Sequence, residues 1–345
     1  MKFSLFVHME RFDPAKPHRE LFHELVELVE IAEAGGFEMI WIGEHLGMEF
    51  TIAPNPFDFM AYLAARTQRI RLGVGTVIAP FWHPLRLAGE AALVDIMSGG
   101  RLELGLARGA YQFEFDRMLG GMKATEGGKH LRELIPVLQR LFVGDCAHQG
   151  ECWSFPTATA MPKPLQTPYP PMWIAARDPD SHNFAVANGC NVMVTPLWHP
   201  DEEVVSLRDR FNAALANNPG VPRPRLMLLR HTHVHERTGD WETPARALSR
   251  YYSYFEEWFR NQRPISNGFI EPLSEAEIAA KAHFAPQLMR DNLVIGQPDT
   301  VITRLKYYER LGYDQYSYWI DNGLPHAAKK RSLELFVDEV MPAFA

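Results

Sequence analysis

The chain has 345 residues, of which 46% are hydrophobic and 22% charged, and its formal net charge is −7. This balance can fill a large core, and the absence of a basic face argues against nonspecific binding to nucleic acid. No apolar run approaches the roughly 18 residues of a membrane span, and the N-terminus is charged too early for a signal peptide. We therefore expect a cytoplasmic protein whose three cysteines are free thiols, with a pair between the first two as a weaker alternative: Cys146, Cys152 and Cys190.

Short apolar strands alternate with amphipathic helical stretches through the first half of the chain, which is typical of repeated βα units. The predicted strands are Lys2–His8, Glu38–Gly43, Ile70–Thr76 and Leu102–Leu106. The predicted helices are Arg19–Ala34, Phe57–Arg66, one that begins at His83-Pro84, and Gly128–Phe142, the last of them after a long loop.

The same alternation continues in the second half and completes eight strands. The strands are Met172–Ala176, Val192–Thr195, Leu226–His235 and Gln315–Ile320, and the helices are Ser181–Asn188, Glu202–Ala216, Asp299–Leu311 and Ala327–Phe336. Eight such units predict an α/β fold, a TIM (β/α)8 barrel that forms a single domain over residues 1–345.

Two segments interrupt the βα rhythm. Residues 144–171, after the fourth strand, are rich in Pro and Thr and read as a hairpin or extended excursion. Residues 241–292, after the seventh strand, carry a run of closely spaced aromatic side chains. Such a stripe is core in most proteins, but an insertion at this place in a barrel also fits a cover over the substrate.

An arginine between two small residues, Arg108, ends the fourth predicted strand and is followed by Gly109. This geometry would bring a guanidinium and backbone N–H groups to the rim of the barrel, where an anion could bind. A tight turn with a solvated arginine is the structural alternative.

Several motifs follow one another in a characteristic order: Glu44-His45, Gly73-Val74-Gly75-Thr76, His83-Pro84, Gly99-Gly100-Arg101-Leu102, Arg108-Gly109-Ala110-Tyr111 and Val294–Thr300. In this order and spacing the chain resembles the bacterial luciferase-like, flavin-dependent monooxygenases, over nearly its whole length and least in the middle third. The resemblance implies an enzyme that takes reduced FMN as co-substrate, traps O₂ as a flavin hydroperoxide and oxygenates a small hydrophobic organic substrate. It also implies a homodimer. A separate flavin reductase is expected because the sequence has no dinucleotide-binding fingerprint.

The resemblance also assigns roles to individual residues. His45 matches the active-site histidine, although Leu46 replaces the second histidine of the luciferases, and neighbouring Glu44 is expected to be structural. Arg108, with Gly109, matches the ligand of the FMN phosphate. The turn at Ala176, Arg177 and Ser181 would complete that site, and an ordinary helix N-cap at Asp178 or Ser181 is the alternative. Arg177 stands where the luciferases carry an acidic residue. Thr76 is expected beside the flavin ring, with a non-prolyl cis peptide at Thr76–Val77.

Aromatic residues near the strand ends predict an apolar pocket that favours a hydrophobic or ring-containing substrate over a charged metabolite: Phe81, Trp82, Phe113, Phe115, Trp198 and Trp319. His231, His233 and His235 alternate on the seventh strand, which suggests a metal site. The first strand lacks the ligands of a zinc barrel, so no metal is expected, and at most His231 or His233 reaches the pocket.

Two other functions stay open from the sequence. One is a deazaflavin-dependent hydride-transfer enzyme of the same family, which needs no oxygen. The other is a catalytically silent flavin-binding protein, against which the presence of His45 argues.

Overall fold

The computed structural model describes residues 1–344 and contains a closed barrel of eight parallel strands. Around the barrel the strands follow the order β1-β2-β3-β4-β7-β8-β9-β13, and β13 pairs again with β1. These strands span β1 Lys2–Phe6, β2 Met39–Ile42, β3 Arg71–Ile78, β4 Leu102–Ala107, β7 Met172–Ala175, β8 Asn191–Val194, β9 Leu226–Val234 and β13 Gln315–Trp319. The predicted TIM barrel is confirmed, with strand ends within a few residues of those expected.

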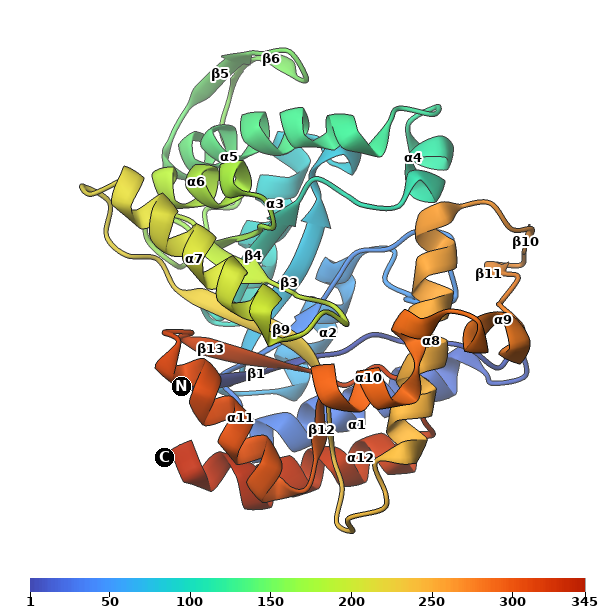
Figure 1. Ribbon diagram of the computed structural model, residues 1–345. Coiled ribbons are helices and arrows are strands. Elements are labelled where there is room, and N and C mark those ends of the chain that lie inside the picture. The colour runs from blue at the N-terminus through green and yellow to red at the C-terminus, as the bar shows by residue number, and fades with distance from the viewer. Residues whose placement is uncertain (345) are drawn as a thin grey trace.

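Helices cover the outside of the barrel, and both termini lie on the same side of it (Figure 1). The helices that follow the successive barrel strands are α1 His18–Ala34, α2 Pro56–Arg66, α3 Pro84–Met97, α5 Gly127–Val143, α6 Pro179–Ala187, α7 Asp201–Asn217, α11 Pro298–Arg310 and α12 His326–Leu335. A π-helical turn, Phe336–Val340, and a final 3₁₀ turn, Met341–Phe344, continue α12. The rings of Phe3 and Phe344 meet edge to face, which holds the two ends together.

Both expected insertions are present. After α5, β5 (Cys146–Gln149) and β6 (Ser154–Ala158) form an antiparallel hairpin that projects from the barrel (Figure 1). After β9 come α8 (Glu242–Arg260), the short pair β10 (Ile265–Ser266) and β11 (Phe269–Ile270), α9 (Glu275–Ala279) and α10 (Pro286–Asn292). In Figure 1, α8 stands beside the barrel between α4 and α10.

Two short elements were not expected. Helix α4 (Gln112–Met118) occupies part of the segment that the sequence predicted as a long loop. The sequence predicted no strand at β12 (Val294–Gly296), yet this segment pairs in parallel with the end of β9, with Val294 opposite Thr232. Both are too short to show a helical or strand period in the sequence. That residues 1–345 form one domain stays a prediction.

Alternation along the strands divides the core into two layers. Side chains such as Leu5, Ile40 and Leu104 pack outward under the helices. Their neighbours Phe6, Trp41 and others face the barrel interior and join the aromatic side chains of α8 in a second cluster. The insertion is thus packed on the same core as the barrel interior, which fixes α8 over one side of its mouth.

Three smaller expectations can be compared with the structure. All three cysteines are free thiols, so the Cys146–Cys152 alternative is wrong. The non-prolyl cis peptide lies at Gly75–Thr76, one bond before the expected position. None of the helices within residues 1–344 combines the length and apolar character that crossing a membrane requires.

Candidate active site

A cavity of about 530 Å³ opens where the carboxyl ends of the barrel strands meet, the place where TIM barrels carry their active sites. It is lined by the ends of β2, β3, β4, β7 and β8 and by one face of α8. Its lining includes most of the site residues expected from the sequence: His45, Thr76, Arg108, Gly109, Ala176, Arg177 and Trp198. Ser181 lies in an adjoining cavity of about 720 Å³ that shares Arg108 and Arg177 with the first.

Four arginines line the second cavity: Arg108, Arg132, Arg177 and Arg210. Two of them, Arg108 and Arg177, also line the first. Arg177 and Arg210 both approach Glu203, at 4.0 and 3.5 Å. Within residues 1–344, neither Arg108 nor Arg132 forms an ion pair. Two unneutralised guanidiniums facing one cavity are the donors that a phosphate group requires. Arg132 escaped the sequence analysis because nothing in a helix sequence shows which face meets a neighbouring loop.

The backbone holds Arg108 by two close contacts. Gly109 adopts φ +85°, and a Cβ there would lie 2.7 Å from the Phe115 ring. At the start of α5, a Cβ on Gly127 would lie 2.0 Å from the Arg108 carbonyl oxygen. The loop after β4 therefore fits against α5 only because both positions are glycine. Arg132 lies on α5 about one turn after Gly127. The contact between Gly127 and Arg108 therefore fixes the two arginines relative to each other.

The N-terminus of α6 differs from the expected arrangement. The Asp178 side chain accepts from the Ser181 N–H, and the Ser181 hydroxyl donates to the Asp178 carbonyl and accepts from the Arg177 N–H. Although burial raises the pKa of Asp178, the bonds from Ser181 hold it below its usual value. The N-cap alternative therefore describes the local structure, and the Ser181 hydroxyl is already engaged.

His45 is half-buried and also lines the first cavity. Its Nδ1 is 3.4 Å from Glu114 Oε1, which also accepts from the Leu46 N–H at 2.7 Å. Its ring meets Tyr111 at 5.3 Å between centroids. Glu114 comes from α4 and is fully buried. Sequence analysis missed Glu114 because α4 was expected to be a loop.

A second histidine, His8, lies below His45, with ring centroids 6.1 Å apart. Its Nε2 accepts from the Gly43 N–H at 3.0 Å, so its Nδ1 donates to Asp321 at 3.0 Å. Burial lowers the pKa of His8, which keeps the ring neutral. His8 therefore fixes the end of β2 from which His45 extends.

Glu44 points away from His45 and is buried. Its carboxyl accepts from the Ile78 N–H at 2.7 Å and from the Trp82 indole at 3.0 Å. Burial raises the pKa of Glu44 to about 7. The structural role expected for Glu44 fits this arrangement, and Trp82 is held by it rather than facing the cavity.

Five of the six aromatic residues expected in the substrate pocket do not line the cavity: Phe81, Trp82, Phe113, Phe115 and Trp319. Helix α4 turns Phe113 onto Trp258 and Phe115 onto Phe81, with centroids 4.9 and 5.2 Å apart. Trp319 stacks on His231 at 3.8 Å. The aromatic lining comes instead from Trp198 and from Phe255 and Phe259 of α8. The aromatic stripe of the second insertion was the signal for this in the sequence.

The histidines of β9 also lie outside this cavity. Burial lowers the pKa of both His231 and His233, that of His233 to about 4. His231 Nδ1 lies 2.6 Å from the Tyr252 hydroxyl, which packs it against α8. The expectation that His231 or His233 reaches the pocket is not met.

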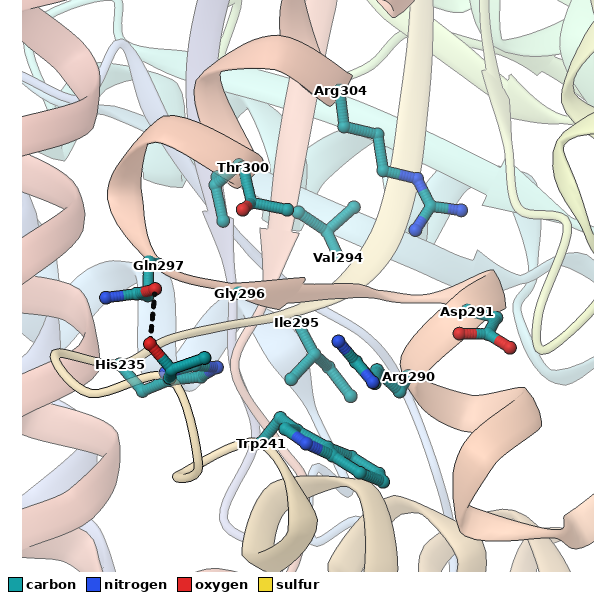
Figure 2. A pocket seen from close by; sticks show the side chains of 12 residues that line it. His235, Trp241, Arg290, Asp291, Val294, Ile295, Gly296, Gln297, Thr300 and Arg304 are labelled. Carbon is teal, nitrogen blue, oxygen red and sulfur yellow. Dashed lines mark hydrogen bonds between the residues drawn. The ribbon is translucent and has the colours of Figure 1, made fainter.

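His235 lines a separate cavity of about 440 Å³ outside the barrel (Figure 2). There the Arg290 guanidinium covers the Trp241 ring, 4.6 Å from its centroid. Arg304 is bonded to Asp201 and to backbone oxygens of residues 292 and 293. None of the residues expected to bind flavin or substrate lines this cavity.

Comparison with known proteins agrees with the motifs. The family described as luciferase-like monooxygenase matches residues 1–315. The chain belongs to this family. The oxygenase component of a flavin-dependent trigonelline monooxygenase from Acinetobacter baylyi is 54% identical over 345 residues, which is all of this chain and 96% of that protein.

Solved structures of two monooxygenases share the whole fold. Monooxygenase RslO1 from Streptomyces bottropensis matches with a TM-score of 0.80 and 25% identity, covering 100% of both chains. The oxygenating constituent of 3,6-diketocamphane monooxygenase from Pseudomonas putida, in complex with FMN, has a TM-score of 0.77 at 18% identity, covering 99% of this chain and 98% of that one. The 54% identity to a flavin-dependent oxygenase component decides the activity. This chain is the oxygenase component of a flavin-dependent monooxygenase, not a deazaflavin-dependent hydride-transfer enzyme.

Proposed function

We propose that this oxygenase uses reduced FMN and O₂ to oxygenate an N-methylated pyridinium carboxylate such as trigonelline, the compound named for its Acinetobacter baylyi relative. The observation that carries the proposal is a pair of adjoining cavities that share Arg108. Arg132 lines one of them, and His45 and three aromatic rings line the other. The sequence favoured a hydrophobic or ring-containing substrate over a charged metabolite; the proposed substrate keeps the ring but carries a fixed positive charge, as the name of the relative suggests.

FMN fits the donors that the chain presents. Arg108 and Arg132 would bind its phosphate, because a dianion gains most from guanidiniums that no carboxylate neutralises. Thr76 and the backbone of Gly75 would lie against the flavin ring at the barrel mouth. Bound reduced FMN supplies the electrons that activate O₂.

The chain's own residues perform the remaining tasks. His45 can accept or release a proton at its Nε2, because Glu114 lies on the Nδ1 side of the ring. Phe255 and Phe259 of α8 cover the cavity and exclude water from it. A separate flavin reductase supplies the reduced cofactor.

The homodimer and the cytoplasmic location expected from the sequence are part of this proposal. Large apolar side chains are exposed close together on α3 and on the segment before β7: Leu93, Ile96, Met97, Met161 and Leu165. An exposed apolar surface of this kind favours contact with a second copy. Sedimentation of the wild-type protein and of Ile96→Glu, expected to dissociate, tests the dimer.

The substrate is tested with purified protein, FMN, NADH, an unrelated flavin reductase and ¹⁸O₂. We expect ¹⁸O to enter the product of trigonelline, and nicotinate, which lacks the methyl group and the fixed charge, to give much less product. A protein that binds FMN but leaves trigonelline unlabelled would contradict the proposed substrate.

A further inference from the structure

The lining of the active-site cavity contains two kinds of side chain. Arg108 and Arg177 supply positive charge, whereas Trp198, Phe255 and Phe259 supply aromatic faces. The phosphate of FMN accounts for the arginines, but nothing in the flavin requires three aromatic rings. The rings are therefore available to select the substrate.

Surrounding contacts hold these rings in place. Trp198 follows Leu197, which adopts φ 53°, and its carbonyl accepts from the Asn292 side chain. The Trp198 ring meets Phe284 at 5.6 Å and Tyr252 at 5.1 Å.

Phe255 and Phe259 lie one turn apart on α8, with centroids 4.8 Å apart, and both contact Tyr111. Positions fixed by packing in this way give a ligand a preformed site, which lowers the entropic cost of binding.

Most charged groups around the rings are paired. The Glu256 carboxylate belongs to the lining and pairs with Lys281 at 2.5 Å and with Arg260 at 3.3 Å. Burial and the nearby Arg177 lower the pKa of His199, so this lining histidine is neutral. A positively charged ring therefore meets aromatic faces beside paired charges here.

We propose that Trp198, Phe255 and Phe259 form a cation–π subsite that selects an N-alkylated pyridinium ring over a neutral ring of the same shape. The inference rests on the proposed function and deepens it. The electron-rich faces of the three rings attract the positive charge spread over a pyridinium, and a neutral ring gains only apolar contact.

The test compares trigonelline with 3-methylbenzoate, which has a methylated ring carbon where trigonelline has the methylated nitrogen. Titration calorimetry on the FMN-loaded protein gives both dissociation constants. We expect the wild type to bind trigonelline at least about 10-fold more tightly. Phe255→Leu, Phe259→Leu and Trp198→Leu should each reduce that preference about 3- to 10-fold, while 3-methylbenzoate binding changes less than about twofold.

Two controls keep the outcomes separate. Phe22→Leu removes an aromatic ring from α1, outside the cavity, and should change neither constant. Variants are compared only if they retain wild-type FMN affinity, and Phe259, which is 43% exposed, is the position that best tolerates the change. If the wild type oxygenates trigonelline but binds both ligands equally, or if all three variants keep the preference, the subsite is wrong and the proposed function stands. If the wild type neither binds nor oxygenates trigonelline, the proposed function has failed first.

Discussion

Arg108 and Arg132 carry the strongest expectation at the scale of single residues, because no carboxylate among residues 1–344 neutralises either guanidinium. Arg108→Ala should weaken FMN binding by about 2 kcal/mol, roughly 30-fold in Kd, the range for losing a charge-assisted contact. Arg132→Ala should act in the same direction. Fluorescence titration with FMN measures both.

Arg246→Ala is the matched control, since Arg246 is exposed on α8 and only loosely paired with Glu242. If FMN affinity is the same in Arg108→Ala, Arg132→Ala and the control, the phosphate lies elsewhere.

His45 is expected to act on the reaction and not on flavin binding. His45→Ala should bind FMN normally and lose about 10²- to 10⁴-fold in product formation, as general acid–base groups do. Steady-state assays with a saturating reductase measure this, and exposed His23→Ala serves as the control. Normal turnover by the variant would show that His45 takes no part in the reaction.

Glu44 predicts a pH dependence of stability. The pKa of Glu44 is about 7 in the folded protein, whereas its ordinary value is 4.5. Between these two pH values the folded protein therefore binds more protons than the unfolded chain. Stability is therefore lost as pH rises through that window. Relative to Glu44→Gln, the free energy of unfolding of the wild type should fall by up to about 3 kcal/mol between about pH 4.5 and about pH 8. Urea denaturation at several pH values tests this, with exposed Glu20→Gln as the control, and parallel curves for wild type and Glu44→Gln would contradict it.

At the scale of elements, the start of α5 offers a matched pair of glycines. Gly127→Ala would force a Cβ to 2.0 Å from the Arg108 carbonyl, a backbone atom that cannot rotate away. The change should destabilise the fold by about 1–3 kcal/mol and weaken FMN binding with it. Gly128→Ala meets only the Arg132 side chain at 3.4 Å and should be neutral or stabilise the helix by up to about 1 kcal/mol. Urea denaturation and FMN titration of the two variants measure the difference, and equal effects would show that the loop after β4 adjusts freely.

Elements with a clear period were predictable from sequence, and short or tertiary-dependent ones were not. Leu102–Ala107 alternates and ends at a glycine-flanked arginine, so both β4 and the place of Arg108 could be inferred. Helix α4 is seven residues long, and its absence from the prediction hid Glu114 and misplaced Phe113. The side chains of Phe113 and Trp319 pack against Trp258 and His231, which lie far away in the sequence. A local sequence pattern therefore does not show which way these two side chains face.

At the scale of the whole molecule, one barrel mouth gathers residues from distant parts of the chain. His45, Arg108, Ala176 and Trp198 share a cavity because parallel strands bring their carboxyl ends to one face. The insertion after β9 then covers part of that face with α8. The order of the strands was therefore enough to predict that these four residues meet. For the insertion, the sequence left a core stripe and a cover as alternatives, and only the structure shows which of its rings line the cavity.

The same architecture predicts dependence on a second protein. The sequence carries no dinucleotide-binding fingerprint, and the 54% identical relative is itself an oxygenase component. With NADH, oxidised FMN and O₂ alone, the purified protein should form little product. An unrelated flavin reductase should restore turnover, because reduced flavin diffuses between proteins, and FMN reduced chemically beforehand should support a single round without NADH. Oxygenated product measured by mass spectrometry separates these cases. Steady turnover with NADH and no reductase would reveal a nicotinamide site on this chain, to be sought first in the insertion over residues 241–292.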